Sequence, residues 1–364
     1  MLRAEILERI ARRETVVGRD LAGIDLSEAD LSGGRFEKVN FSGADFSGAD
    51  VGRTGFADCD FTGARFRGSR LEKLNWTGMT MPHTDFTGAR LFMMLFGKSD
   101  LSGADFSGAH IHMCTLQETN ISGARFRKAR VEQNALQKTS CAGTDFSGAT
   151  LIRLAFSDSD MRSLVLDEAS LHKVFFRGCD FTGYRFAGLH MRIVQFDGAK
   201  LDGADFCGCA LPMCNFMGAS LRGADLREAR LENALFVGAD MERARFSRGT
   251  FRQAAFSEGN LTDADCEKGD FELCLFQKAR LRRANFSGAN LKNADFSYAD
   301  LSEGNFTDTT LYMAQFHKAV EEDAHFGVSK KTLLQGPDPD RAAAEAFRPH
   351  AKPRPERNHP KENP

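Results

Sequence analysis

The sequence contains no run of apolar residues approaching the ~20 that a membrane span requires. Its first eight residues, Met1 to Glu8, include acids where a secretory signal peptide has an unbroken apolar segment. Charge of either sign is not in excess, with 48 Lys and Arg against 50 Asp and Glu. A protein held on nucleic acid by counterion release needs a strongly basic face. These absences predict a cytoplasmic protein without a membrane span and argue against a nucleic-acid partner.

Cysteine is too scarce for a disulfide framework, since 364 residues contain nine cysteines, an odd number. The closest group, Cys207, Cys209 and Cys214, lacks the C-x-x-C spacing of a zinc site. Six cysteines share one repeat position where Ala is usual, which predicts small buried apolar residues in a reducing compartment. These six are Cys59, Cys114, Cys179, Cys209, Cys214 and Cys274.

A five-residue repeat is what the sequence has instead. All 60 positions at every fifth residue from Leu21 to Phe316 are apolar, two of them Cys, without an insertion or deletion. The residue two before each of these centre positions is mostly small, as in Ala44 and Ala104. Two apolar side chains two residues apart lie on one face of a short extended stretch. Ser-Gly and Thr-Gly pairs in the remaining positions indicate tight turns.

A second period of twenty residues is superposed on the first. Residues 231–236, 251–256 and 271–276 resemble one another more closely than neighbouring pentapeptides do. Turn composition loosely follows the same period. Because four pentapeptides make twenty residues, each coil is expected to have four sides and a square cross-section.

The segments Ala44-Asp45-Phe46-Ser47-Gly48 and Ala289-Asn290-Leu291-Lys292-Asn293 resemble the A-[DN]-[LF]-x-x motif of pentapeptide repeat proteins. The resemblance implies an all-β fold, a right-handed quadrilateral β-helix of about fifteen coils. The expected organisation is a short N-terminal helical cap over residues 1–20, the β-helix over 21–320, a C-terminal cap over 321–336 and a disordered tail over 337–364. The cap helix is predicted from the amphipathic pattern of residues 2–14, and the tail from its proline and charge content.

No catalytic constellation and no cofactor or metal site emerges from the sequence. Gly97-Lys98-Ser99 ends like a phosphate-binding loop, but Phe92 stands where the first Gly of that motif belongs. His112 and His172 share one side of the coil, but three coils separate them by roughly 14 Å at strand spacing, too far for one metal ion. The chain is therefore predicted not to be an enzyme.

Charged residues form columns at twenty-residue spacing. One column alternates acids with arginines, which predicts cross-strand pairing that serves solubility and register rather than catalysis. It contains Asp45, Arg65, Asp85, Asp105, Arg125 and Asp145, and later Arg185, Asp205, Asp225, Arg245 and Asp265. A neighbouring column, Arg70, Arg90, His110 and Arg130, is a short basic stripe, for which a solvated face is preferred over an anion-binding surface.

Large apolar residues occupy outward-facing positions on one side of the predicted coil. They indicate a function, because Met and aromatic residues on a surface are typical of interfaces. Two alternatives remain open. Either extended sides simply favour bulky residues, or a terminal segment of this chain covers part of this row of apolar residues. The candidate partner-binding residues are Phe92, Met93, Leu95, Met113, Ile152, Phe175, Ile193, Met213, Leu235, Leu273, Leu275, Tyr312 and Met313.

Between residues 154 and 194 the small position two before the centre becomes bulky, which predicts local widening or distortion of the coil. The bulky residues are Leu154, Leu164, Val174, Tyr184, Leu189 and Val194.

Two functions from different classes follow. The first is a protein-interaction scaffold or adaptor, its partner a secretion-apparatus component or effector, with a homodimer left open. The opening, with Ala11-Arg12-Arg13-Glu14 leading into Gly18 to Gly23, resembles pentapeptide repeat proteins associated with bacterial type VI secretion. The alternative is a DNA-mimicking modulator of a type II topoisomerase such as gyrase, from which this chain departs in its near-zero charge and its alternating Arg residues.

Overall fold

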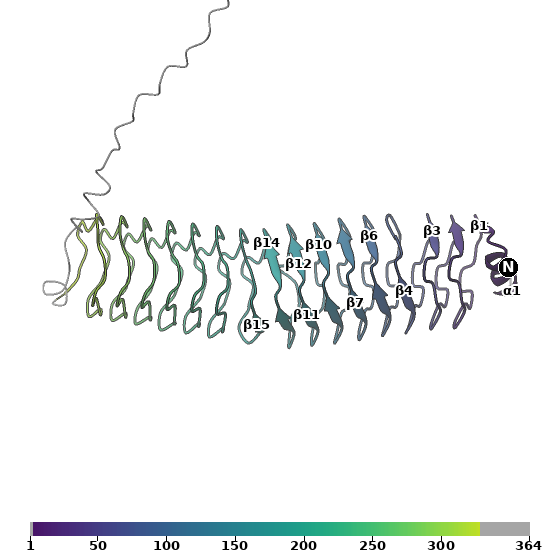
Figure 1. The fold of residues 1–364 in the computed structure, drawn as a ribbon, viewed down its shortest axis with the longest axis horizontal. Coiled ribbons are helices and arrows are strands. Elements are labelled where there is room, and N and C mark those ends of the chain that lie inside the picture. Colours follow the sequence, from purple (N-terminus) through teal and green to yellow (C-terminus); the bar gives the residue numbers. More distant parts are fainter. Residues whose placement is uncertain (1–2, 328–364) are drawn as a thin grey trace, which may run out of the picture.

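The computed structural model describes residues 3–327, which form a rod with a single helix at its N-terminal end (Figure 1). Parallel pairing joins each rung to the residue twenty positions further along, from Thr15 and Arg35 at one end to Asn305 and His325 at the other. Twenty residues therefore make one turn, and four pentapeptides supply its four sides. The expected all-β, parallel solenoid is confirmed.

Three parallel sheets run along the first part of the rod. One contains β1 (Thr15–Val17), β2 (Arg35–Glu37) and β3 (Gly55–Ala57). The second contains β6 (Leu95–Gly97), β8 (Thr115–Gln117), β10 (Ala135–Gln137), β12 (Ala155–Ser157) and β14 (Phe175–Arg177). The third contains β4 (Arg70–Glu72), β5 (Arg90–Phe92), β7 (His110–His112), β9 (Arg130–Glu132), β11 (Thr150–Ile152), β13 (Ser170–His172) and β15 (His190–Arg192). Within the described residues, the rungs after Arg192 are single bridges rather than strands.

Helix α1 (Arg3–Ala11) closes the N-terminal end of the solenoid. Ile6 is fully buried, and Leu7 and Ile10 pack against the core. After the helix ends at Ala11, Arg13 has φ 58° and donates its N–H to the Ile10 carbonyl, and the Glu14 N–H donates to the Arg9 carbonyl, a Schellman arrangement. The helical segment is shorter than the region expected as a cap, because β1 already pairs with β2 from residue 15 onward.

At the other end the repeat extends past residue 320. His325 bridges Asn305, and the ring of Phe326 stacks on that of Phe306 with centroids 4.9 Å apart. Glu321 departs from the apolar pattern of the centre positions, yet the pairing continues past it, so the β-helix extends beyond the predicted bound of residue 320. The remainder of the expected C-terminal cap, up to residue 336, and the expected tail over 337–364 lie outside the described residues.

The core is a set of columns in which centre side chains from successive turns stack. Phe216 lies 4.9 Å from Phe236 at an interplanar angle of 2°, and Phe236 lies 4.8 Å from Phe256 at 3°. Burying one such ring contributes about 1.5–3 kcal/mol, and an aromatic pair adds about 0.5–1.5 kcal/mol. Trp76 occupies one of these columns, and its buried indole N–H has no hydrogen-bond acceptor in the described part of the chain.

Polar residues at the small position are accommodated by one recurrent hydrogen bond. The Ser69 hydroxyl donates to the Phe46 carbonyl at 2.7 Å, and the Thr144 hydroxyl donates to the Ile121 carbonyl at 2.9 Å. In each case the acceptor lies 23 residues earlier, which is the centre residue of the preceding turn. A buried hydroxyl here is therefore satisfied rather than costly.

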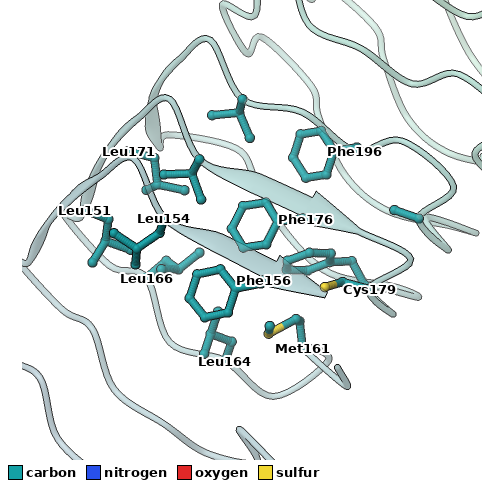
Figure 2. Close-up of a cluster of buried hydrophobic side chains, with 14 of the residues drawn as sticks. Leu151, Leu154, Phe156, Met161, Leu164, Leu166, Leu171, Phe176, Cys179 and Phe196 are labelled. Carbon is teal, nitrogen blue, oxygen red and sulfur yellow. The ribbon is translucent and has the colours of Figure 1, made fainter. Parts of the chain in front are cut away.

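The bulky segment coincides with breaks in the bridge ladder at two places, while the ladder beside Leu154, Val174 and Val194 stays paired. Leu154 and Leu164 point into the interior beside Phe156 and Phe176 (Figure 2). Over residues 154–210, all of them described, the ladder of bridges is interrupted between Val165 and residue 185, and between residue 190 and residue 210. A cleft of about 400 Å³ opens at the second interruption. Side chains wider than Ala push neighbouring turns apart, because a well-packed interior has no spare volume.

A small internal cavity of about 20 Å³ lies earlier in the rod, between Phe96 and Phe146. Leu116 and Leu136 line it and interrupt the column that otherwise carries Phe96 and Phe156. Two consecutive leucines leave the space that stacked rings would fill. The cavity is therefore a defect of packing in one column.

Replacing Leu136 by Phe is expected to stabilise the protein by about 1 kcal/mol, because the ring fills the cavity and restores stacking. Thermal and urea unfolding measure the change. The matched control is Leu221→Phe at a fully buried site with no cavity beside it, where overpacking costs about 1–3 kcal/mol. Equal destabilisation by both substitutions would contradict this account of the cavity.

Asp and Asn side chains immediately before the centre position stabilise the turns by accepting hydrogen bonds. The Asp30 carboxylate accepts the backbone N–H of Ser32 at 2.9 Å and its hydroxyl at 2.5 Å. These hydrogen bonds hold the pKa of Asp30 below its ordinary value. At Asp105 burial by itself would raise the pKa, but hydrogen bonds from Ser107 and Arg125 outweigh it and the net pKa is lowered. Such side-chain turns explain the preference for Asp and Asn at this position.

Because these pKa values are lower in the folded chain than in the unfolded one, their contribution to stability is present above about pH 5 and is lost as pH falls through the folded values. We expect the urea midpoint to be level between about pH 7 and 5 and to fall below about pH 4. Asp30→Asn combined with Asp105→Asn should flatten that fall, since Asn40 shows that an amide oxygen accepts the same turn N–H, at 2.9 Å. An unchanged acid slope in this variant would refute the assignment.

Candidate functional site

The outward-facing large apolar side chains gather on one side of the rod. We define the apolar side as residues 12–17 and every corresponding segment twenty residues further on, such as 92–97 and 212–217. Of the thirteen exposed large hydrophobic residues in the described part of the chain, twelve lie on this side, and Val320 is the exception. Six positions in twenty thus carry nearly all of the exposed apolar surface, which is far from an even distribution.

The residues predicted from the sequence all face outward. Phe92, Ile152 and Ile193 are half-buried. The exposed members are Met93, Leu95, Met113, Phe175, Met213, Leu235, Leu273, Leu275, Tyr312 and Met313. The sequence analysis did not identify Val17 and Met217, which are exposed on the same side. Each directly follows a centre residue of this side, a position that the sequence analysis did not consider.

The apolar residues form separate clusters rather than one unbroken stripe. Met93 and Met113 are on adjacent turns, but Gln133, Arg153 and Lys173 follow them at the same position before Ile193. These polar side chains divide the apolar side into patches. Tyr312 also interacts locally, since the Lys292 ammonium lies 5.8 Å from its ring centroid.

Several of these residues occupy a backbone conformation that disfavours them. Met213, Leu273 and Ile193 have φ of 62°, 62° and 57°, in the left-handed region. A side chain there costs about 1 kcal/mol or more relative to glycine, and a β-branched residue is the worst case. Polar residues at the corresponding turns, such as Lys73, Arg243 and Glu258, adopt the same conformation, so it is a general property of the turn and does not by itself account for the apolar residues.

The charged column pairs across turns as predicted. Arg65 lies 3.1 Å from Asp45, and Arg245 lies 2.8 Å from Asp225. Arg125 with Asp105, and Arg185 with Asp205, repeat the pairing further along the rod. Exposed pairs of this kind contribute about 0–1 kcal/mol each. Their main effect is to neutralise the acids of the surface.

The basic stripe is a continuous row on β4, β5, β7 and β9, where Arg70, Arg90, His110 and Arg130 pair in register. Arg130 contacts Glu132 at 2.9 Å, which reduces the charge available for an anionic partner. The structure also brings together His110, His112 and Glu132. The sequence analysis considered His112 only together with His172 and did not identify this group. The His-x-His pattern of His110 and His112, with an acid twenty residues after His112, could have indicated it.

The segment Gly97-Lys98-Ser99 is part of the solenoid wall. Gly97 ends β6, and the buried Ser99 hydroxyl donates to the Trp76 carbonyl at 2.5 Å. A phosphate loop needs backbone N–H groups that converge on an anion. This segment instead has the local geometry of every other turn.

The cysteine side chains are poor nucleophiles. All nine are free, and eight are buried, including the six predicted to be buried from their repeat position. Burial raises the pKa of Cys114 to about 11 and that of Cys214 to about 12. Cys207 is half-buried; burial, with the nearby Asp225 carboxylate, raises its pKa to a smaller extent. A thiol reacts as the thiolate, so these shifts suppress chemistry.

Residues 29–106, 140–206 and 209–286, more than half of the chain, match the family described as Pentapeptide repeat region. Residues 99–133 and 274–311 match the family described as Pentapeptide repeats (8 copies). No curated protein matches the chain. None of the helices within residues 3–327 has the length and apolar character needed to cross a membrane.

Solved structures similar to this chain include pentapeptide repeat proteins. HetL from the cyanobacterium Nostoc, involved in heterocyst differentiation regulation, is 20% identical with a TM-score of 0.30, and the match covers 70% of this chain and 87% of HetL. A protein of the Arabidopsis thaliana thylakoid lumen is 28% identical with a TM-score of 0.28, over 28% of this chain and 71% of that one. QnrB1, a plasmid-mediated fluoroquinolone resistance protein, is 17% identical with a TM-score of 0.27, over 76% and 94%.

Thiol reactivity tests the burial of the cysteines. With a disulfide reagent near pH 8, we expect one thiol, Cys207, to react in the native protein and all nine to react in denaturant. Cys207→Ser should remove the native reaction and leave unfolding unchanged. Rapid labelling of two or more thiols in the folded protein would contradict the described packing.

Proposed function

Because the chain belongs to the pentapeptide repeat family, we propose that it is a non-enzymatic scaffold or adaptor that binds a protein partner through its apolar side. The family is consistent with an interaction role, and the solenoid takes up most of the described residues. The observation that carries the proposal is the confinement of twelve of thirteen exposed large hydrophobic residues to that side.

The energetics of this surface suit a partner. Burying one Met, Leu or Phe side chain is worth about 1.5–3 kcal/mol, while association costs an estimated 4–15 kcal/mol of translational and rotational freedom. A partner that spans two or three of the apolar patches would recover that cost. The polar residues between the patches, Arg153, Lys173 and Gln133, also supply the polar rim that surrounds the apolar centre of an interface.

Many of the thiols and carboxylates that could perform catalysis are otherwise engaged, which supports a non-enzymatic role. Buried thiols have raised pKa values, as for Cys214. Carboxylates such as Asp105 accept turn N–H groups and arginine N–H groups. The free cysteines also support a reducing, cytoplasmic compartment as part of the proposal.

In its finer form, the proposal makes the chain an accessory factor of bacterial type VI secretion. It rests on the resemblance of residues 11–23, where α1 ends and the first turn of the solenoid begins. A DNA-mimicking role at a topoisomerase is less well supported. Mimicry of a polyanion needs unpaired acids along the rod, whereas Asp45, Asp105 and Asp225 are each paired with an arginine.

The decisive variant is Met213→Ser, Leu273→Ser and Met313→Ser, three exposed residues of the apolar side with φ near 60°. Its control is Arg243→Ser, Arg248→Ser and Lys268→Ser, which are exposed at the same backbone conformation on other sides. We expect the apolar variant to lose partners that co-purify with the full chain from its native host, by about tenfold or more, and the control to keep them.

Circular dichroism and thermal unfolding should show that both variants remain folded, because the substituted side chains point to solvent. Retention of every partner by the apolar variant would overturn the proposed surface. Loss of the partners in the control variant alone would transfer the function to a different side of the rod.

A further inference from the structure

Three side chains with metal-ligand chemistry meet on the outer surface of β7 and β9. His110 and His112 are two residues apart on β7, so both point outward from the same strand. Glu132 on β9 pairs directly with His112 in the parallel ladder. One ligand atom from each residue lies within 4.8 Å of the other two. His110 is exposed, and the other two are half-buried.

The surroundings orient two of the three groups. The Gln133 side-chain carbonyl lies 2.7 Å from His112 Nε2, so this nitrogen carries the proton and donates it, and Nδ1 keeps its lone pair. The Phe92 ring packs edge-on against His112 with centroids 5.6 Å apart. Arg130 donates to Glu132 Oε2 at 2.9 Å, which leaves Oε1 available. Partners of this kind, outside the ligands themselves, fix tautomer and orientation in metal sites.

The basic stripe gives this arrangement its context. His110 pairs between Arg90 and Arg130, and like charges directly opposite one another are destabilising. Histidine at the middle position keeps the two arginines two turns apart and supplies an imidazole nitrogen, a common metal ligand. The carboxylate of Glu132 offsets the guanidinium of Arg130, and Arg90 remains as the positive neighbour that a bound cation has to tolerate.

We propose that His110, His112 and Glu132 form a binding site for a divalent transition-metal ion, with zinc as the best-suited ion. Two imidazole nitrogens and one carboxylate oxygen bind zinc at about 2.0–2.2 Å, which places ligand atoms about 3.3 Å apart in a tetrahedron. Small side-chain rotations close the observed separation to this value. Three protein ligands leave a fourth position for water or for a ligand from a partner.

The site is independent of the proposed scaffold function, although two of its ligands, His112 and Glu132, lie on the apolar side as defined above. It adds an ion-dependent contact point to a surface that otherwise offers apolar patches and paired charges. The rigid register between β7 and β9 fixes His112 opposite Glu132, so the site does not depend on a mobile loop.

Titration of the full-length chain with Zn²⁺ by calorimetry, and with Co²⁺ by visible absorption, tests the site. We expect one ion per chain above background, with tetrahedral Co²⁺ bands, and binding about tenfold or more weaker in His112→Ala and in Glu132→Gln. The control is His172→Ala at the corresponding position on β13, where the paired residues Ile152 and Arg192 supply no ligand.

All variants keep the other histidines of the chain, so non-specific binding is common to every measurement. Equal affinity of wild-type protein and His112→Ala, or no binding by the wild-type chain at micromolar ion, would overturn the site. A loss in His172→Ala as large as in His112→Ala would do the same. Circular dichroism of each variant separates loss of ligand from loss of fold, and partner binding by these variants reports separately on the scaffold function.

Discussion

The structure depends on one constraint, the alignment of every residue with the residue twenty positions away. Backbone hydrogen bonds between adjacent turns and the stacking of centre side chains both require it, as in the pairing of Asn215 with Leu235 and the stacking of Phe216 on Phe236. An insertion of one residue would move the following apolar side chains off the core face. The absence of insertions over sixty pentapeptides is the sequence counterpart of this requirement.

The same register organises the surface, because outward residues twenty apart become neighbours about 4.8 Å apart. It places Arg65 against Asp45, so that acids and arginines on adjacent turns pair. It also gathers Met93 and Met113, and opposes His112 with Glu132. The columns of outward side chains that adjacent turns bring together are therefore the surfaces through which this solenoid can act.

Departures from the register are local and have packing causes. Tyr184 and Leu189 at positions normally occupied by Ala coincide with the interrupted bridges before residue 210, whereas Leu116 and Leu136 leave a small cavity in an aromatic column. The interrupted bridges coincide with too much side-chain volume in the interior, and the cavity results from too little. Trp76 shows a third case, since its buried indole N–H lacks an acceptor within residues 3–327, at a cost of about 1–3 kcal/mol.

The sequence by itself determined the five- and twenty-residue periods, the parallel four-sided coil, the buried cysteines, the pairing of Arg65 with Asp45 and the side on which Met93 and Leu275 lie. All of these follow from periodicity, which fixes the direction of each side chain once the turn length is known. Only the tertiary structure decided that the repeat continues to His325 past Glu321, that the apolar side is divided into patches, and that His110, His112 and Glu132 converge. These depend on rotamers, on the separation of specific atoms and on pairing that tolerates a polar centre residue, none of which a repeat pattern specifies.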